Sequence, residues 1–104
     1  MIRKAFKMKL YSDKKKEYIK RHNPIWPELE IVLKQQGVTN YSLFLDAETY
    51  ILFGYAEIEN EQKWDEIANI EICKKWWNFM SDMMETNLDN SPKSSNLEEV
   101  FHIN

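Results

Sequence analysis

The sequence predicts an α+β fold in which helices pack on one face of an antiparallel sheet. Segments typical of strands occur at residues 2–10, 38–46 and 49–58, and segments typical of helices occur between and after them. The last two strand segments are separated only by Asp46-Ala47-Glu48, so they are expected to form an antiparallel hairpin. A chain of 104 residues has the length of one domain, so we expect residues 1–104 to form a single unit.

The first two elements are a strand and a helix. Residues 2–10 alternate in polarity, which is typical of a strand with one covered side. The covered side would carry Ile2, Phe6, Met8 and Leu10. A helix is predicted over residues 14–22, with Ser12 or Asp13 as its N-terminal cap. Pro24 disfavours helical geometry at the residue before it, so this helix should end just before the proline.

A second helix and a hairpin occupy the middle of the chain. The helix is predicted over residues 24–36, because Pro27 suits its first turn and Gly37 suits its C-terminal end. Residues 38–46 and 49–58 are both rich in aromatic and β-branched side chains, which favours two paired strands.

The last part of the chain repeats the order of helix then strand. Asn60 opens a helical region, and a second helical pattern covers residues 70–85. The stripe of that pattern contains Trp76, Met80, Met83 and Met84. Residues 86–96 predict an ordered loop, and residues 97–103 a short final strand. The whole order is that of a ferredoxin-like split βαβ domain, whose uncovered sheet face would suit a second subunit's sheet.

Composition excludes several classes of partner. The net charge is −3 with mixed signs, which gives no electrostatic basis for binding nucleic acid. No apolar run reaches membrane-spanning length, and no signal peptide is recognisable. The lone Cys73 cannot form an intrachain disulfide and fits a small core residue. We therefore expect a cytoplasmic protein, and the 13% of aromatic residues favours a ring-lined pocket or a homodimer interface.

The first candidate site is the segment around His22, one of two histidines in the chain. Tyr18 precedes His22 by one helical turn, so the two side chains lie on the same helix face. His22 is expected near a helix C-terminus, where the helix dipole favours the imidazolium form. With an unperturbed pKa of about 6.5, the group is close to its titration point at neutral pH. We interpret His22 as a proton donor, against the alternative of a helix cap or a solvated residue.

Aromatic residues elsewhere extend this candidate site. Trp76 and Trp77 are adjacent in a predicted helix, so one ring can enter the core while the other faces a pocket. Indole rings stack on the C–H face of a sugar, although packing in the core or a dimer would explain them equally well. Tyr41 opens a predicted strand, and its phenol is either a hydroxyl-binding group or an ordinary strand aromatic.

Other chemistries find little support in the sequence. His22 and His102 are far apart, and neither has a Cys or carboxylate at a metal-ligand spacing. Only two glycines are present, which excludes a phosphate-binding loop. No nucleophile motif accompanies the histidine, and no nicotinamide- or flavin-binding pattern is recognisable. We therefore expect a pocket that uses neither metal nor cofactor.

Across essentially its full length the chain resembles the L-rhamnose mutarotase family. The resemblance rests on Met1-Ile2-Arg3-Lys4-Ala5-Phe6, Tyr18, Arg21-His22-Asn23-Pro24-Ile25-Trp26-Pro27-Glu28-Leu29, Tyr41, Trp64, Trp76-Trp77, Asp89-Asn90-Ser91-Pro92 and Glu99-Val100-Phe101, in that order. It implies a dimeric α/β barrel of ferredoxin-like subunits that interconverts the α and β anomers of L-rhamnose in the cytoplasm. In enzyme terms this is an isomerase of the racemase and epimerase type, acting without metal or cofactor.

The resemblance also implies roles for five residues. His22 corresponds to the proton donor, and Tyr18, Tyr41, Trp76 and Trp77 correspond to sugar-binding positions. The reaction would open the sugar ring and close it on the other face, with water or a carboxylate as the base. The same barrel fold also hosts cofactor-free monooxygenases and haem-degrading enzymes, so one of these, or a non-catalytic sugar-binding module, is the alternative.

Overall fold

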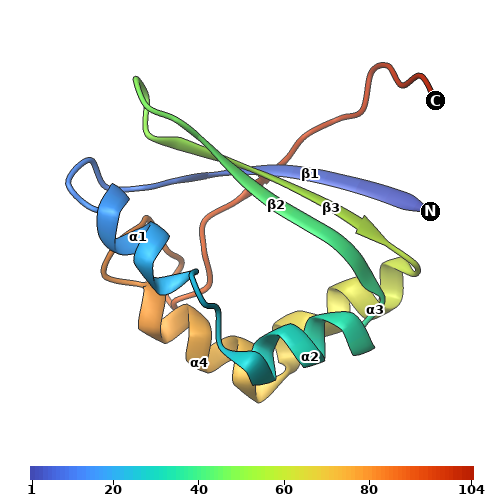
Figure 1. Ribbon diagram of the computed structural model, residues 1–104, viewed down its shortest axis with the longest axis horizontal. Helices are drawn as coiled ribbons and strands as arrows, with labels where there is room; N and C mark the ends of the chain where they lie inside the picture. Colours follow the sequence, from blue (N-terminus) through green and yellow to red (C-terminus); the bar gives the residue numbers. More distant parts are fainter.

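The computed structural model describes residues 1–104 and contains one antiparallel sheet with helices on one of its faces (Figure 1). The strands are β1 (Ile2–Lys9), β2 (Val38–Asp46), β3 (Ile51–Ile58) and β4 (Ser95–Asn96). Their spatial order is β2-β3-β1-β4, which is the ferredoxin-like order. The predicted α+β class with a split βαβ arrangement is therefore confirmed.

Two central strands give the sheet its covered face. Phe6 of β1 lies opposite Gly54 of β3, and Gly54 in turn lies opposite Leu43 of β2. Phe6, Met8 and Leu52 are buried on this face against the helices. Gly54 is required here, because a Cβ atom at its position would meet the Phe6 ring at 2.3 Å.

The first two helices are both shorter than expected, and a longer connection, residues 22–26, separates them. Helix α1 (Lys15–Arg21) begins after Lys14, with no side-chain cap, so the prediction of a Ser12 or Asp13 cap is wrong. Helix α2 (Pro27–Gln35) begins three residues later than predicted. Its N-cap is Trp26, which is extended at ψ 127°, because a residue before proline is driven out of helical geometry. The expected place of Pro27 in the first turn is confirmed.

The second helical region consists of three pieces. Helix α3 (Glu61–Glu66) begins after Asn60, whose side chain accepts a hydrogen bond from the Lys63 backbone, as the sequence indicated. A 3₁₀ turn, η1 (Ile67–Asn69), leads into helix α4 (Glu71–Met80). The predicted continuation of that helix to residue 85 is wrong.

Methionines beyond the end of α4 explain the misjudged boundary. Met83 and Met84 are buried, as a helical stripe would require, but they enter the core from a turn. Met84 forms a β-bridge with Leu10, and the Met83 carbonyl accepts the Tyr11 backbone N–H. Buried apolar residues at helical spacing do not distinguish a last helical turn from a loop that packs inward.

The hairpin and the C-terminus differ from prediction at their ends. Strand β3 begins at Ile51, because Tyr50 adopts a positive φ of 58° in the turn. The predicted strand over residues 97–103 is wrong: only Ser95 and Asn96 pair with β1, and residues 97–104 have no regular structure. This segment runs away from the helices (Figure 1).

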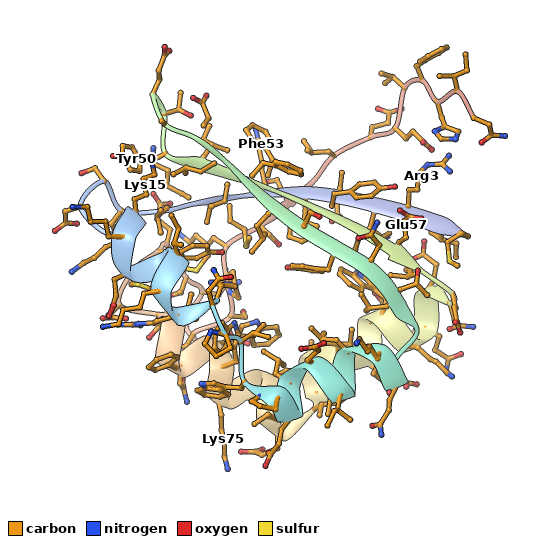
Figure 2. The ribbon with its side chains drawn as sticks, in the orientation of Figure 1. Arg3, Lys15, Tyr50, Phe53, Glu57 and Lys75 are labelled. Carbon is orange, nitrogen blue, oxygen red and sulfur yellow. The ribbon has the colours of Figure 1, made fainter.

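The outer sheet face and the C-terminal segment share an apolar character. Phe44 and Phe53 pair across β2 and β3 and remain exposed on the face away from the helices (Figure 2). Val100, Phe101 and Ile103 of the C-terminal segment are more than three-quarters exposed. Their strand-like pattern therefore reflects side chains that nothing in this one chain covers. None of the helices has the length and apolar character of a membrane-spanning segment.

Candidate functional site

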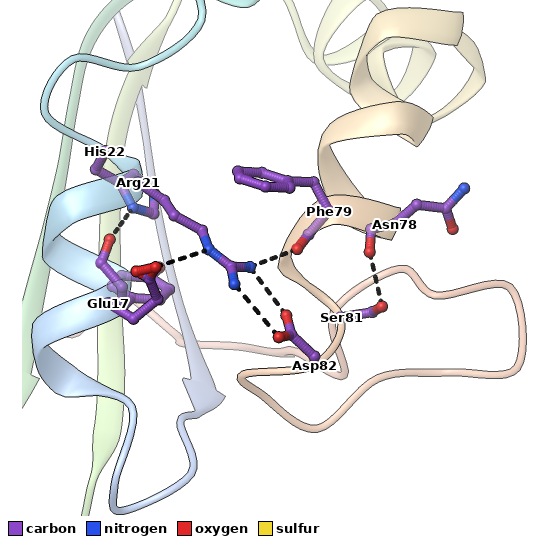
Figure 3. A network of polar contacts seen from close by, with 8 residues as sticks. Glu17, Arg21, His22, Asn78, Phe79, Ser81 and Asp82 are labelled. Carbon is purple, nitrogen blue, oxygen red and sulfur yellow. Dashed lines mark hydrogen bonds and ion pairs between the residues drawn. The ribbon is translucent and has the colours of Figure 1, made fainter.

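His22 lies at the C-terminal end of α1, held from one side by the helix itself. Its backbone N–H donates to the Ile19 carbonyl, and its ring Nδ1 lies 2.8 Å from the Tyr18 carbonyl oxygen (Figure 3). A carbonyl oxygen only accepts hydrogen bonds, so Nδ1 carries a proton in this geometry. The other nitrogen, Nε2, is therefore the atom that gains and loses a proton.

Burial decides the charge of this imidazole. Desolvation lowers the pKa of His22 below its usual 6.5, and the hydrogen bond to the Tyr18 carbonyl offsets only part of that effect. The lowered pKa favours the neutral imidazole, against the imidazolium form that the helix terminus was expected to favour. Burial disfavours the charged form of a histidine, because the charge is taken out of water. His22 is mainly neutral at pH 7.

Aromatic rings surround His22 on the helix side of the site. The Tyr18 ring lies 4.4 Å from the imidazole between centroids, and the Trp76 ring meets it edge-on at 5.2 Å. Trp76 also contacts Trp26 edge-on at 5.0 Å and Phe79 at 5.7 Å. These contacts bring together α1, α4 and the residue that begins α2.

A second group of rings lies on the sheet. Tyr41 of β2 is 6.1 Å from Phe6 of β1, which is 6.2 Å from Trp64 of α3. Tyr41 is 41% exposed, yet desolvation raises the pKa of its phenol to about 12, as expected for a side chain that is surrounded by protein and still open to solvent.

The two tyrosines connect these ring groups. The pKa of Tyr18 is also raised, first by burial and second by repulsion from the Tyr41 phenolate. That repulsion means that the two hydroxyls lie within electrostatic reach of each other. Both phenols therefore remain protonated at neutral pH, and each is available as a hydrogen-bond donor.

The structure thus gathers four of the five expected residues. The His22 ring contacts both Tyr18 and Trp76, and Tyr41 on the sheet is near enough to Tyr18 to raise its pKa. Trp77 is half-buried against the core and makes no ring contact with them. Trp26, Phe79, Phe6 and Trp64 also belong to these ring groups, although no site role was predicted for them. Trp26 had a signal, because it stands in the His22 motif, and Phe79 had one in its i,i+3 spacing from Trp76.

Two surface hollows lie elsewhere. One, of about 260 Å³, is lined by residues that include Arg3, Tyr55 and Glu99. The other, of about 540 Å³, includes Lys7, Glu85 and Lys93. Both border β1 near the C-terminal segment, and their lining lacks a histidine, so we place the candidate site at the aromatic group around His22. No group of three or more His, Cys, Asp or Glu side chains is arranged to hold a metal ion.

Sequence comparison identifies close relatives. A family model described as L-rhamnose mutarotase matches residues 3–103. The L-rhamnose mutarotase of Lachnoclostridium phytofermentans is 57% identical over 103 residues, and the match covers 99% of each chain.

Comparison with solved structures points to the same family. The crystal structure of an L-rhamnose mutarotase from Formosa agariphila has a TM-score of 0.93 and 48% sequence identity, with 100% of both chains covered. A dimeric ferredoxin-like protein from an uncultured marine organism has a TM-score of 0.65 at 13% identity, with 97% of this chain and 95% of that chain covered. The latter similarity shows the fold alone.

Proposed function

This chain belongs to the L-rhamnose mutarotase family, and we propose that it interconverts the α and β anomers of L-rhamnose. The observation that carries the proposal is a full-length match at 57% identity in a chain whose rings gather around one partly buried histidine. We further propose its class as an isomerase of the racemase and epimerase type, working in the cytoplasm on rhamnose metabolism without a cofactor.

His22 is the proton-transfer group in this proposal. Its Nε2 is unprotonated at neutral pH, so it first takes the proton of the anomeric hydroxyl. The C1–O5 bond then breaks, C1 becomes an aldehyde carbon, and the ring oxygen takes the proton from Nε2. The two oxygens share carbon C1, so one nitrogen can reach both. This replaces the separate base that the sequence analysis left open.

The reverse sequence produces the other anomer. After rotation about C1–C2, Nε2 removes the proton from the C5 hydroxyl as that oxygen attacks the opposite face of the aldehyde. The new anomeric oxygen then takes the same proton. A positioned acid–base group of this kind typically contributes about 10²–10⁴-fold to a rate.

The surrounding residues bind and orient the sugar. The protonated phenols of Tyr18 and Tyr41 are suited to hydrogen bonds with sugar oxygens, because their raised pKa values keep them neutral. Trp76 offers an indole face and edge beside His22 for the apolar side of the ring. We propose Trp77 as a sugar contact on the family resemblance alone.

We propose a homodimer for the whole protein. The support is the exposed pair Phe44 and Phe53 on the outer sheet face, together with the exposed apolar side chains at the C-terminus. Burying this surface against a second copy is favourable. Sedimentation equilibrium should give twice the chain mass for the wild type and a shift toward monomer for Phe53→Lys. A monomeric wild type would refute the dimer.

Polarimetry tests the proposed reaction. Freshly dissolved crystalline L-rhamnose changes its optical rotation slowly as it reaches anomeric equilibrium. We expect the protein to increase that rate constant in proportion to its concentration, without changing the final rotation. A rate equal to that of buffer with heat-denatured protein would refute the function.

A further inference from the structure

Arg21 makes an unusually complete set of contacts beside the site (Figure 3). Its Nη1 and Nη2 donate to the two carboxylate oxygens of Asp82 at 2.9 and 3.3 Å. Nη1 also donates to the Phe79 backbone carbonyl at 2.5 Å. Glu17 is 3.9 Å away on the same helix, and the guanidinium lies 4.4 Å from the centroid of the Phe79 ring.

These contacts join the ends of two helices that are distant in sequence. Arg21 is the last residue of α1, and Phe79 and Asp82 stand at and just beyond the end of α4. The Phe79 carbonyl belongs to the last helical turn, where backbone acceptors lack partners within the helix. The Arg21 side chain is only 16% exposed, while its partner Asp82 is 63% exposed, so the contact fixes the arginine without burying the carboxylate.

The two helix ends that Arg21 joins, those of α1 and α4, also carry the His22 imidazole and the ring it contacts. His22 directly follows Arg21, and it contacts the Trp76 ring edge-on. The Phe79 ring beneath the guanidinium packs on both Trp76 and Trp26. A shift of Arg21 therefore changes the backbone that carries His22 and the aromatic wall that the imidazole touches.

We infer that Arg21, paired with Asp82, is a positioning residue that fixes the His22 imidazole against Trp76 for proton transfer. The inference rests on the proposed function for its kinetic consequence. Two nearby carboxylates, Asp82 and Glu17, offset the guanidinium charge, so the effect on His22 is one of geometry. Misplacing a reacting group by about 1 Å is enough to reduce a rate by about 100-fold.

The test compares three variants of the intact chain. Arg21→Met removes the guanidinium, which donates the paired hydrogen bonds, and keeps an apolar side chain over Phe79. Arg21→Lys keeps the charge but cannot make the paired hydrogen bonds to a carboxylate. Lys34→Met is the matched control, because it removes an exposed ion pair with Glu30 on α2 that touches none of these residues.

Two readouts separate positioning from general stability. The first is the NMR chemical shift of the His22 ring protons. The neighbouring Tyr18 and Trp76 rings move this shift away from its ordinary value, and it can be measured whether or not the protein is active. The second is kcat against KM for anomer exchange, corrected for the folded fraction. All kinetics are measured at one pH.

The expected results are specific to each variant. Arg21→Met should move the His22 ring protons toward ordinary values and lower kcat by about 10–100-fold with KM changed far less. Arg21→Lys should lie between this variant and the wild type, and Lys34→Met should match the wild type in both readouts. Unchanged His22 shifts in Arg21→Met, or a kcat loss explained by unfolded protein, would overturn the inference. A wild type without anomer exchange would instead refute the proposed function, while the NMR readout would still decide the role of Arg21.

Discussion

The His22 Nδ1 atom lies 2.8 Å from the backbone carbonyl oxygen of Tyr18, one helical turn earlier in α1. This contact is set by the backbone, so the tautomer of the imidazole does not depend on another side chain. Nε2 is then the only atom in this ring group that readily gains or loses a proton near neutral pH. The two neighbouring phenols stay protonated there, because their pKa values are raised. The contact therefore defines which atom the reaction uses.

Replacing His22 should remove most of the activity while leaving the fold. We expect His22→Gln to lower the enzymatic rate by about 10²–10⁴-fold, because the amide cannot accept and return a proton. Circular dichroism should show an unchanged secondary structure. His102→Gln is the control, since that residue lies in the exposed C-terminal segment. Equal activity of His22→Gln and His102→Gln would remove His22 from the mechanism.

The pH dependence should show an acidic limb and a long plateau. The lowered pKa of His22 places the limb below pH 6.5, and kcat/KM should fall about tenfold for each unit below that pKa as Nε2 becomes protonated. The plateau should extend beyond pH 9, because the Tyr41 pKa is raised to about 12 and the Tyr18 pKa is raised as well. Activity that declines between pH 7 and 9 would mean that imidazolium is the active form.

The two neighbouring tryptophans should differ in their effect on stability. Trp76 is 8% exposed and contacts three aromatic rings, so Trp76→Ala should lower the free energy of unfolding by about 3–5 kcal/mol. Trp77 is half-buried, and its replacement by Ala should cost less. Urea unfolding of the two variants measures the difference. A larger loss for Trp77→Ala would contradict the packing described here.

Gly54 should tolerate no side chain. Its added Cβ would lie 2.3 Å from two atoms of the Phe6 ring, so Gly54→Ala should destabilise the fold by about 1–3 kcal/mol. The displaced ring would also press on Tyr41 and raise KM. Adding Phe6→Leu should recover part of the stability, which urea unfolding of the double variant would show. Full stability of the single variant would refute this close approach.

Much of the fold was predictable because its elements carry local signals. The alternation in β1, the polar break in the hairpin and the Asn60 cap each depend on residues within a few positions. The larger errors, at the end of α4 and in the C-terminal segment, lie where contacts with distant residues decide the structure. The end of α4 depends on Arg21 and Leu10, which are far away in sequence. The C-terminal pattern reflects apolar side chains that one chain leaves exposed.

The candidate site was predictable in composition and less so in its electrostatics. Tyr18 and His22 share a helix face, so their contact follows from spacing. The approach of Tyr41 and the packing of Trp26 depend on how the sheet and helices meet. The lowered pKa of His22 was not foreseen for the same reason, because its main cause is desolvation by burial, which depends on tertiary packing.

The most direct test of the central claim is saturation-transfer NMR on equilibrated L-rhamnose at neutral pH. One anomeric proton is irradiated and the signal of the other anomer is followed, with wild-type protein and with His22→Gln at equal concentration. We predict a loss of the second signal with the wild type and almost none with the variant. Equal signals with and without folded wild-type protein would contradict the assignment of L-rhamnose mutarotation to this chain.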